Sequence, residues 1–270
     1  MPVVTMLEKV YTPFSPKMFE PIFTSLCEGL RVRVEVAGKT NRGWLQIDVS
    51  GEDETVALNF LDRKIGLAPV YTDALEKSST MKGRIVSSDR SGVNLFVDVG
   101  VFSPQPIDAA VELRTLQAQL ADGKKLPLKK LTEIFCLHNN FPLEVKIVGS
   151  PSAEKGYVEA ELSEGQLSRI AEWMQSYLDR LIVLGAMLSD VENAVGRSKH
   201  GRDIIKIESL GLLEHAVECK LGTDAVGLIP KLGPLLSTAT LISFCPRKIG
   251  NSSIDRSFEQ NSFSSANVRV

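Results

Sequence analysis

Apolar and polar residues alternate along several short segments of the chain. In LRVRVEV (30–36) the apolar side chains fall on one side of an extended strand and the charged ones on the other. WLQIDV follows after a polar turn, and such a pair is typical of a β-hairpin. Apolar residues at helical spacing flank the hairpin, once ahead of Gly29 and once from Val56 to Ile65. Residues 1–78 are therefore predicted to form a small α/β module with the order β-α-β-β-α.

A second series of alternating segments begins with MKGRIVSSDRSGVNLFVDVGV at 81–101. The short strands AAVEL and LEVKIV follow, and a helical connection that contains GKKLPLKK separates them. Five short strands with a helical insertion between the fourth and the fifth are the layout of an OB-type barrel. An OB-like β-barrel is therefore predicted over 79–150.

The next segment combines helices and strands. Ser163 and Gln166 form a capping box ahead of an amphipathic helix. LIVLGA, DIIKIES, LEHAVECK, AVGLIP and TLISFCP predict strands. Residues 151–250 are predicted to be an α+β module with a second antiparallel, OB-like sheet, so the whole chain falls in the α+β class. DAAVEL and DAVGLIP each follow a glycine-hinged strand, which leaves open a duplication of the barrel. Residues 251–270, rich in Ser and Asn, predict a disordered tail.

Composition excludes several classes of protein. The chain has 43% hydrophobic and 24% charged residues and a net charge of -2, so no basic surface dominates the molecule. No signal sequence or membrane-spanning run is present, and the four cysteines never occur in C-x-x-C spacing, which predicts a cytoplasmic protein with reduced thiols. Cys136 and His138 lack a second ligand pair, and no phosphate loop or nucleophilic triad is present. No metal, cofactor, catalytic residue or membrane partner is predicted.

Two resemblances add to this interpretation. GRIVSSDRSGVNLFVDVGV with AAVEL and LEVKIV resembles the OB-type barrel of RNA-binding modules like those of ribosomal protein S-one. DAVGLIPKLG resembles the fourth strand of the same module and the turn after it. The order of FLDRKIGLAP, VDVGV, LADGKKLPL, SLGLLEH and CKLGTDAVGLIPKLG resembles an uncharacterised conserved archaeal protein family over residues 1–250. That resemblance implies a cytoplasmic archaeal protein and supplies no activity.

Residues 80–150 are the one segment with a positive balance, 9 Lys and Arg against 7 Asp and Glu. Its cations can neutralise phosphates and its aromatic side chains can stack on bases, although the barrel offers few exposed aromatics. The predicted nucleic-acid-binding residues are Lys82, Arg84, Arg90, Phe96, Phe102, Lys124, Lys125, Lys129 and Lys130. A second basic group lies at the end of a predicted helix and consists of Arg197, Lys199 and Arg202. The helix dipole alone favours cations at this position. The alternative is that these residues form a phosphate-binding turn.

These patterns predict a non-catalytic RNA-associated protein of archaeal information processing that binds RNA or a ribonucleoprotein through the barrel's basic face. One alternative is a scaffold that contacts a protein partner through sheet edges or the helix at 163–178. The other is an RNA-modifying enzyme with a site between modules near LIVLGAMLSD. A polar cleft with perturbed pKa values would favour the enzyme, and a filled apolar junction would argue against it.

Overall fold

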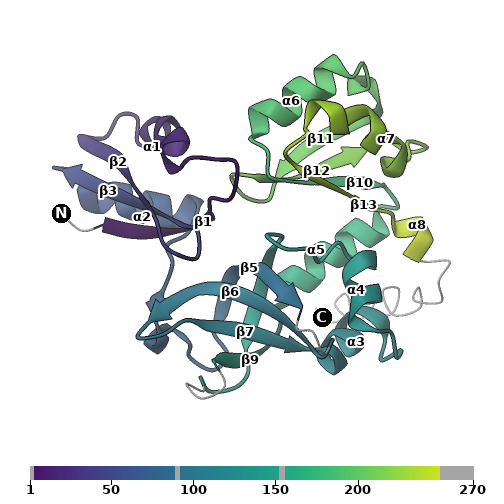
Figure 1. The fold of residues 1–270 in the computed structure, drawn as a ribbon, viewed down its shortest axis with the longest axis horizontal. Helices are drawn as coiled ribbons and strands as arrows, with labels where there is room; N and C mark the ends of the chain where they lie inside the picture. The colour runs from purple at the N-terminus through teal and green to yellow at the C-terminus, as the bar shows by residue number, and fades with distance from the viewer. Residues whose placement is uncertain (1–2, 89–91, 152–155, 250–270) are drawn as a thin grey trace, which may run out of the picture.

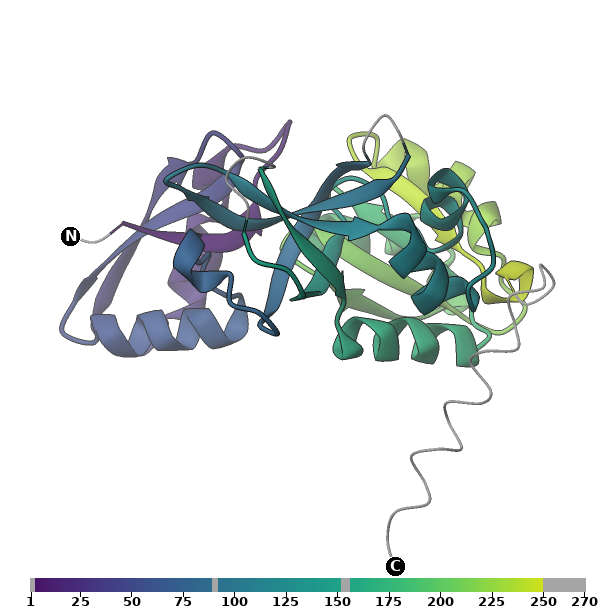
Figure 2. The ribbon, with the colours of Figure 1, turned by 90° about the horizontal axis from the view of Figure 1, so that it is seen from below.

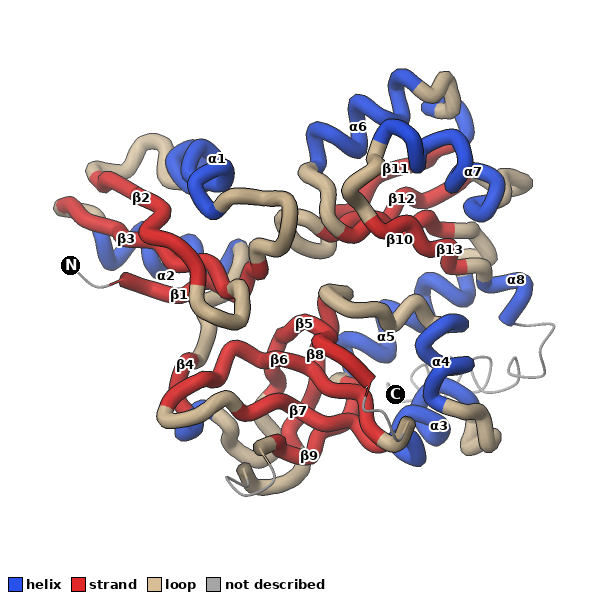
Figure 3. The backbone as a smooth tube through the Cα atoms, in the orientation of Figure 1, coloured by secondary structure: helices blue, strands red, loops and turns tan. Residues whose placement is uncertain are grey.

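The computed structural model describes residues 3–88, 92–151 and 156–249 (Figure 1). The strands form three sheets that succeed one another along the chain (Figure 3). Arg90 and the predicted tail at 251–270 lie outside the described residues. Among the helices of the described ranges, none combines the length and the apolar character needed to cross a bilayer.

The N-terminal module is a three-stranded antiparallel sheet in the order β1-β3-β2, with two α-helices. Its elements are β1 (Val3–Lys9), α1 (Glu20–Leu26) after a 3₁₀ turn at Pro16–Phe19, β2 (Val32–Lys39), β3 (Trp44–Gly51) and α2 (Glu54–Lys64). The sequence order β-α-β-β-α is the predicted one. Phe19 and Phe23 are fully buried against Ile47 and Leu61 in a shared apolar core. Pro21 lies in the first turn of α1, where its missing N–H costs no helical hydrogen bond.

The central unit is a closed five-stranded barrel in the order β5-β6-β7-β9-β8, with β8 paired back to β5. Its strands are β5 (Thr80–Ser88), β6 (Asn94–Ser103), β7 (Ile107–Glu112), β8 (Pro142–Ile147) and β9 (Tyr157–Leu162). Neighbouring strands are antiparallel except β7 and β9, which are parallel. The short strand β4 (Val70–Tyr71) pairs in parallel with the C-terminal end of β6. This Greek-key closure confirms the predicted OB-like barrel.

Two details of the predicted barrel are corrected. The closing strand β9 lies beyond residue 150, in the segment assigned to the C-terminal α+β module. Its Val158, Ala160 and Leu162 alternate into the barrel core. The helical insertion, α3 (Leu113–Ala121) and α4 (Leu128–Ile134), lies between the third and fourth strands rather than the fourth and fifth.

The C-terminal unit contains a second antiparallel sheet, as predicted, in the order β11-β12-β10-β13. Its elements are β10 (Arg180–Leu184), α6 (Leu188–Arg197), β11 (Ile204–Ser209), β12 (Glu214–Cys219), α7 (Ala225–Leu232), β13 (Thr240–Phe244) and α8 (Pro246–Ile249). The sequence β-α-β-β-α-β with this strand order is the ferredoxin-like arrangement. It does not repeat the barrel, so the two units did not arise as copies of one barrel topology. Helix α5 (Glu164–Gln175) precedes it, with the predicted capping bond from the N–H of Gln166 to Ser163.

The segment AVGLIP, predicted as a strand, forms most of α7. Asp224 caps this helix by accepting a hydrogen bond from the N–H of Val226 at 3.0 Å. Ala225, Leu228 and Leu232 lie at helical spacing and are buried against the sheet. The resemblance of DAVGLIPKLG to a fourth barrel strand is therefore wrong.

Helices α6 and α7 cover one face of the C-terminal sheet (Figure 1). The opposite face, which carries Ile182, Ala216 and Phe244, shares its core with the barrel and α5. The rings of Trp173 and Phe244 pack edge to face with centroids 5.4 Å apart. The N-terminal module and the α3–α4 insertion lie at opposite ends of the molecule (Figure 2).

Candidate functional site

An aromatic pair lies on the outer surface of the barrel. Phe96 of β6 alternates with the buried Leu95 and Val97, so it points away from the core. It packs edge to face against Tyr157 of β9, with ring centroids 5.8 Å apart. The two rings reach across β7, where Ala110 is paired with Phe96 and leaves room for them. We call Phe96, Ala110 and Tyr157 the stacking face. OB-type barrels bind oligonucleotides on their second and third strands, here β6 and β7.

Charge around the stacking face is mixed. Asp108, the register partner of Tyr157, accepts a hydrogen bond from Arg42 Nη2 at 2.7 Å, and Glu112 and Glu159 are exposed nearby on β7 and β9. The insertion, whose helix α3 packs against β7 and β9, carries cations after α3 and on α4. The predicted lysines of this insertion are all accessible, with Lys124 partly exposed and the others exposed: Lys124, Lys125, Lys129 and Lys130.

The structure does not gather the other predicted residues on this face. Phe102 lies six residues from Phe96 on β6, about 20 Å along the strand, and is partly buried. Lys82 is exposed on β5 and Arg84 is buried. The second basic group is exposed at and after the end of α6, as the helix dipole favours: Arg197, Lys199 and Arg202.

Arg84 belongs to a buried cluster that joins all three units. Its Nη2 lies 2.5 Å from Glu8 Oε2 of β1 and 3.2 Å from Glu214 Oε2 of β12. Tyr11 donates a hydrogen bond to Glu214 Oε1 at 2.9 Å. A Cβ atom at Gly211 would collide with both Glu214 and Arg84, so glycine is required there. We call Glu8, Tyr11, Arg84 and Glu214 the junction cluster.

Burial dominates the ionisation of the junction cluster. It raises the pKa of Glu214 to about 7; Arg84 opposes this shift and Glu8 adds to it. Burial also raises the pKa of Tyr11, and the neighbouring Glu214 carboxylate raises it further. Burial alone would lower the pKa of Arg84, but Glu214 and Glu8 together outweigh it and raise the value.

A carboxyl group that titrates near neutrality is a frequent mark of an active site. The Glu214 side chain, however, is 0% exposed, and its hydrogen-bond and ion-pair partners come from two other units. The adjacent Leu213 is also fully buried, in the core of the N-terminal module. The junction cluster therefore links the three units through buried contacts.

A second buried cluster fixes the N-terminal module on the barrel. Asp98 of β6 accepts hydrogen bonds from Lys9 at 2.6 Å and from the indole N–H of Trp44 at 3.1 Å, and pairs with Arg42 at 3.0 Å. Burial lowers the pKa of Lys9 although Asp98 opposes the shift. Burial likewise raises the pKa of Asp108 against the effect of Arg42. These contacts hold Arg42 at the edge of the stacking face.

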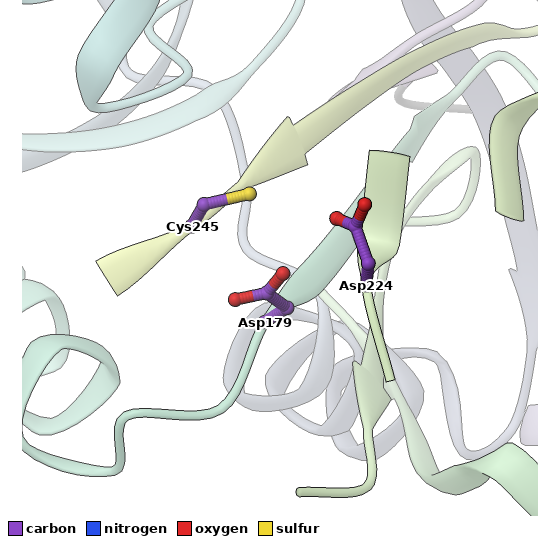
Figure 4. Close-up of side chains that lie close together, drawn as sticks. All are labelled: Asp179, Asp224 and Cys245. Atoms are coloured by element: carbon purple, nitrogen blue, oxygen red, sulfur yellow. The ribbon is translucent and has the colours of Figure 1, made fainter. Parts of the chain in front are cut away.

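One group of side chains has the composition of a metal site. Asp179, Asp224 and Cys245 converge beside the start of α7, with their ligand atoms within 4.8 Å of one another (Figure 4). Both carboxylates already accept backbone hydrogen bonds from the first turn of α7, Asp179 from Ala225 and Asp224 from Val226. Burial raises the pKa of Cys245 to about 11, so its thiol is protonated at neutral pH. Capping of the helix explains the two aspartates.

The described residues define a three-unit α+β protein in which an OB-type barrel packs against two smaller sheets. The DUF2110 central domain matches residues 75–174, and the DUF2110 C-terminal domain matches residues 178–243. Together these matches span more than half of the chain, which therefore belongs to the DUF2110 family. No curated protein matches the chain significantly.

Two solved structures show weak likeness to the chain. The intact alpha subunit of aIF2 from Pyrococcus abyssi is 7% identical, with a TM-score of 0.23, over 63% of this chain and 96% of that chain. The protein ttk003000868 from Thermus thermophilus is 15% identical, with a TM-score of 0.17, over 96% of this chain and 42% of that chain. Both scores are too low to relate the folds.

Sequence reasoning missed Tyr157 and the partners of Arg84. The alternation of YVEAEL was the available signal for Tyr157, since it identifies a strand with an outward-facing aromatic residue at its start. Nothing in the sequence pairs Glu8 or Glu214 with Arg84, because the three residues belong to separate units.

Proposed function

We propose that the protein is a non-catalytic, cytoplasmic, RNA-associated protein of archaeal information processing, and that it binds single-stranded RNA across the stacking face. The observation that carries this proposal is the Phe96–Tyr157 pair on the outer surface of β6 and β9. Aromatic rings on an OB-type surface stack on bases, and this stacking tolerates any sequence because every base has a π-face.

The charged residues around the stacking face are expected to contribute less to binding than its aromatic rings. Lys125, Lys129 and Lys130 are exposed on the insertion that follows β7, and they can neutralise phosphates of a bound strand that extends from the stacking face to the insertion. The carboxylates of Glu112 and Glu159 limit the positive potential at the face itself. Stacking should therefore contribute more affinity than charge. The C-terminal sheet offers no second platform of the RNA-recognition-motif kind, because the barrel and α5 cover its free face.

Replacement of Phe96 or Tyr157 by alanine is expected to weaken binding of a single-stranded RNA oligonucleotide by about 5-fold to 100-fold each. Tyr157→Phe keeps the ring and should bind almost as the wild type does. Fluorescence anisotropy at fixed salt provides the measurement. Tyr71→Ala is the matched control, since Tyr71 is 62% exposed on β4, away from the stacking face. Equal losses in Tyr71→Ala and Tyr157→Ala, or no loss in Phe96→Ala, would contradict the proposal.

Neutralisation of the four insertion lysines is expected to change the salt dependence of the same binding. With Lys124, Lys125, Lys129 and Lys130 replaced by glutamine, the slope of log K against log salt should become shallower by about 3. The control replaces Arg197, Lys199 and Arg202, which should leave the slope unchanged. If only the control variant alters the slope, the RNA lies on the α6 side of the protein and the barrel does not bind it.

A further inference from the structure

A cleft with a volume of about 380 Å³ lies where the three units meet, and we call it the junction cleft. Part of its wall is apolar and partly exposed: Leu7 of β1, Leu26 of α1 and Leu212 of the β11–β12 turn all line it. Its size falls in the range of pockets that hold small molecules. A wall of this kind accommodates the uncharged portion of a ligand.

Three cations surround the junction cleft, one from each of three elements. Lys64 ends α2, Lys82 lies on β5, and Arg169 lies on α5. All three side chains are exposed, and none forms an ion pair within the described part of the chain. Exposed cations that converge from separate elements without a carboxylate partner favour an anionic ligand.

The acidic residues of the junction cleft are already engaged. Glu8 is bound to Arg84, and Glu144 accepts a hydrogen bond from Ser163 at 2.6 Å. Arg84 lines the cleft as a fourth cation, and its buried Nε has no hydrogen-bond partner among the described residues. A buried donor without a partner costs free energy unless a ligand or water satisfies it. The lining of the cleft therefore carries four cations against two carboxylates that are already engaged.

We propose that the junction cleft binds a phosphorylated small molecule of about nucleotide size, with its phosphate held by Lys64, Lys82 and Arg169 and its uncharged portion against the leucine wall. Arginine and lysine form their strongest hydrogen bonds with such oxygens. The site is separate from the stacking face and does not depend on RNA binding there. The same phosphate chemistry occurs in a free nucleotide and at the end of an RNA strand.

Calorimetric titration of the full chain with adenosine monophosphate, inorganic phosphate and adenosine tests the site. The nucleotide is expected to bind more tightly than phosphate, and adenosine more weakly than either. Lys82→Ala, Lys64→Ala and Arg169→Ala should each weaken nucleotide binding by about tenfold. Lys231→Ala, which changes an exposed lysine on α7 outside the cleft, is the matched control and should have no effect.

An RNA oligonucleotide with a 5′-phosphate and the same strand with a 5′-hydroxyl distinguish the two sources of phosphate. If both strands bind equally and adenosine monophosphate still binds the cleft, the ligand is a free nucleotide. If the 5′-phosphate tightens RNA binding and Lys82→Ala removes that gain, the ligand is the end of an RNA strand. Phe96→Ala should bind the nucleotide normally, so failure of RNA binding leaves this site testable. The proposal is overturned if neither phosphate nor nucleotide binds, if adenosine binds as well as its phosphate, or if Lys231→Ala matches Lys82→Ala.

Discussion

Replacement of Arg84 by methionine is expected to lower the free energy of unfolding by about 3–5 kcal/mol. The guanidinium lies between the carboxylates of Glu8 and Glu214, at 2.5 and 3.2 Å. Without it the two buried carboxylates face each other with no cation between them, and one must take up a proton or move toward water. Denaturant unfolding followed by tryptophan fluorescence measures the effect, since Trp44 lies in the N-terminal module and Trp173 on α5.

Two further variants separate charge from packing in this experiment. Arg114→Met changes an exposed arginine on α3 and should alter the free energy of unfolding by less than about 0.5 kcal/mol. Combining Arg84→Met with Glu8→Gln and Glu214→Gln removes every charge of the junction cluster and should recover much of the loss. A stable Arg84→Met protein would show that the cluster does not hold the units together. A triple variant no better than the single one would assign the loss to packing.

The alternation of apolar and polar residues predicted the N-terminal hairpin and most of the barrel. In LRVRVEV and MKGRIV one side of each strand packs in a core, so the period of two is visible in the residues themselves. The amphipathic helix at 163–178 was equally clear, because its cap and its apolar face agree. Such elements are predictable because their apolar residues pack within their own unit, so the burial pattern is visible in the local sequence.

The errors arose where a short apolar run fits two structures. AVGLIP contains too few residues to show a period, and Pro230 near its end suited a strand edge as well as a helix end. The segment is helical because this conformation buries Ala225 and Leu228 against the sheet and lets Asp224 cap its first turn. The strand β9 was overlooked because the strong helix after it dominated the segment, and Tyr157 was lost with it.

The polar faces of the strands were the least predictable feature. Arg84 occupies a position that alternation assigns to solvent, and in an isolated barrel it would be exposed. Packing of the two other units against that side of β5 turns it into a buried ion, whose partners Glu8 and Glu214 come from distant parts of the chain. Contacts between units have no local signature, so charged residues that look alike in the sequence, such as Lys82 and Arg84, acquire different roles.

Between about pH 4.5 and pH 7 the free energy of unfolding is expected to fall by roughly 3 kcal/mol through Glu214 alone. Burial raises the pKa of this carboxyl from 4.5 to about 7, so across that interval the folded protein holds a proton that the unfolded chain has released. The stabilisation is present in full below the lower value and is lost as the pH rises through the upper one. The groups that face the Glu214 carboxyl are Arg84 of β5, Glu8 of β1 and Tyr11 after β1.

Glu214→Gln isolates this contribution, because the amide carries no titrating proton. The difference in unfolding free energy between the variant and the wild type should shift by roughly 3 kcal/mol over the same interval, in favour of the variant at high pH. Lys9 and Asp108 also have shifted pKa values, but both proteins contain them and their effects cancel. A carbon-13 titration of the Glu214 carboxyl should show a midpoint near 7. A midpoint near 4.5 and a constant difference would mean that Arg84 offsets burial completely, so that the link between the three units is independent of pH.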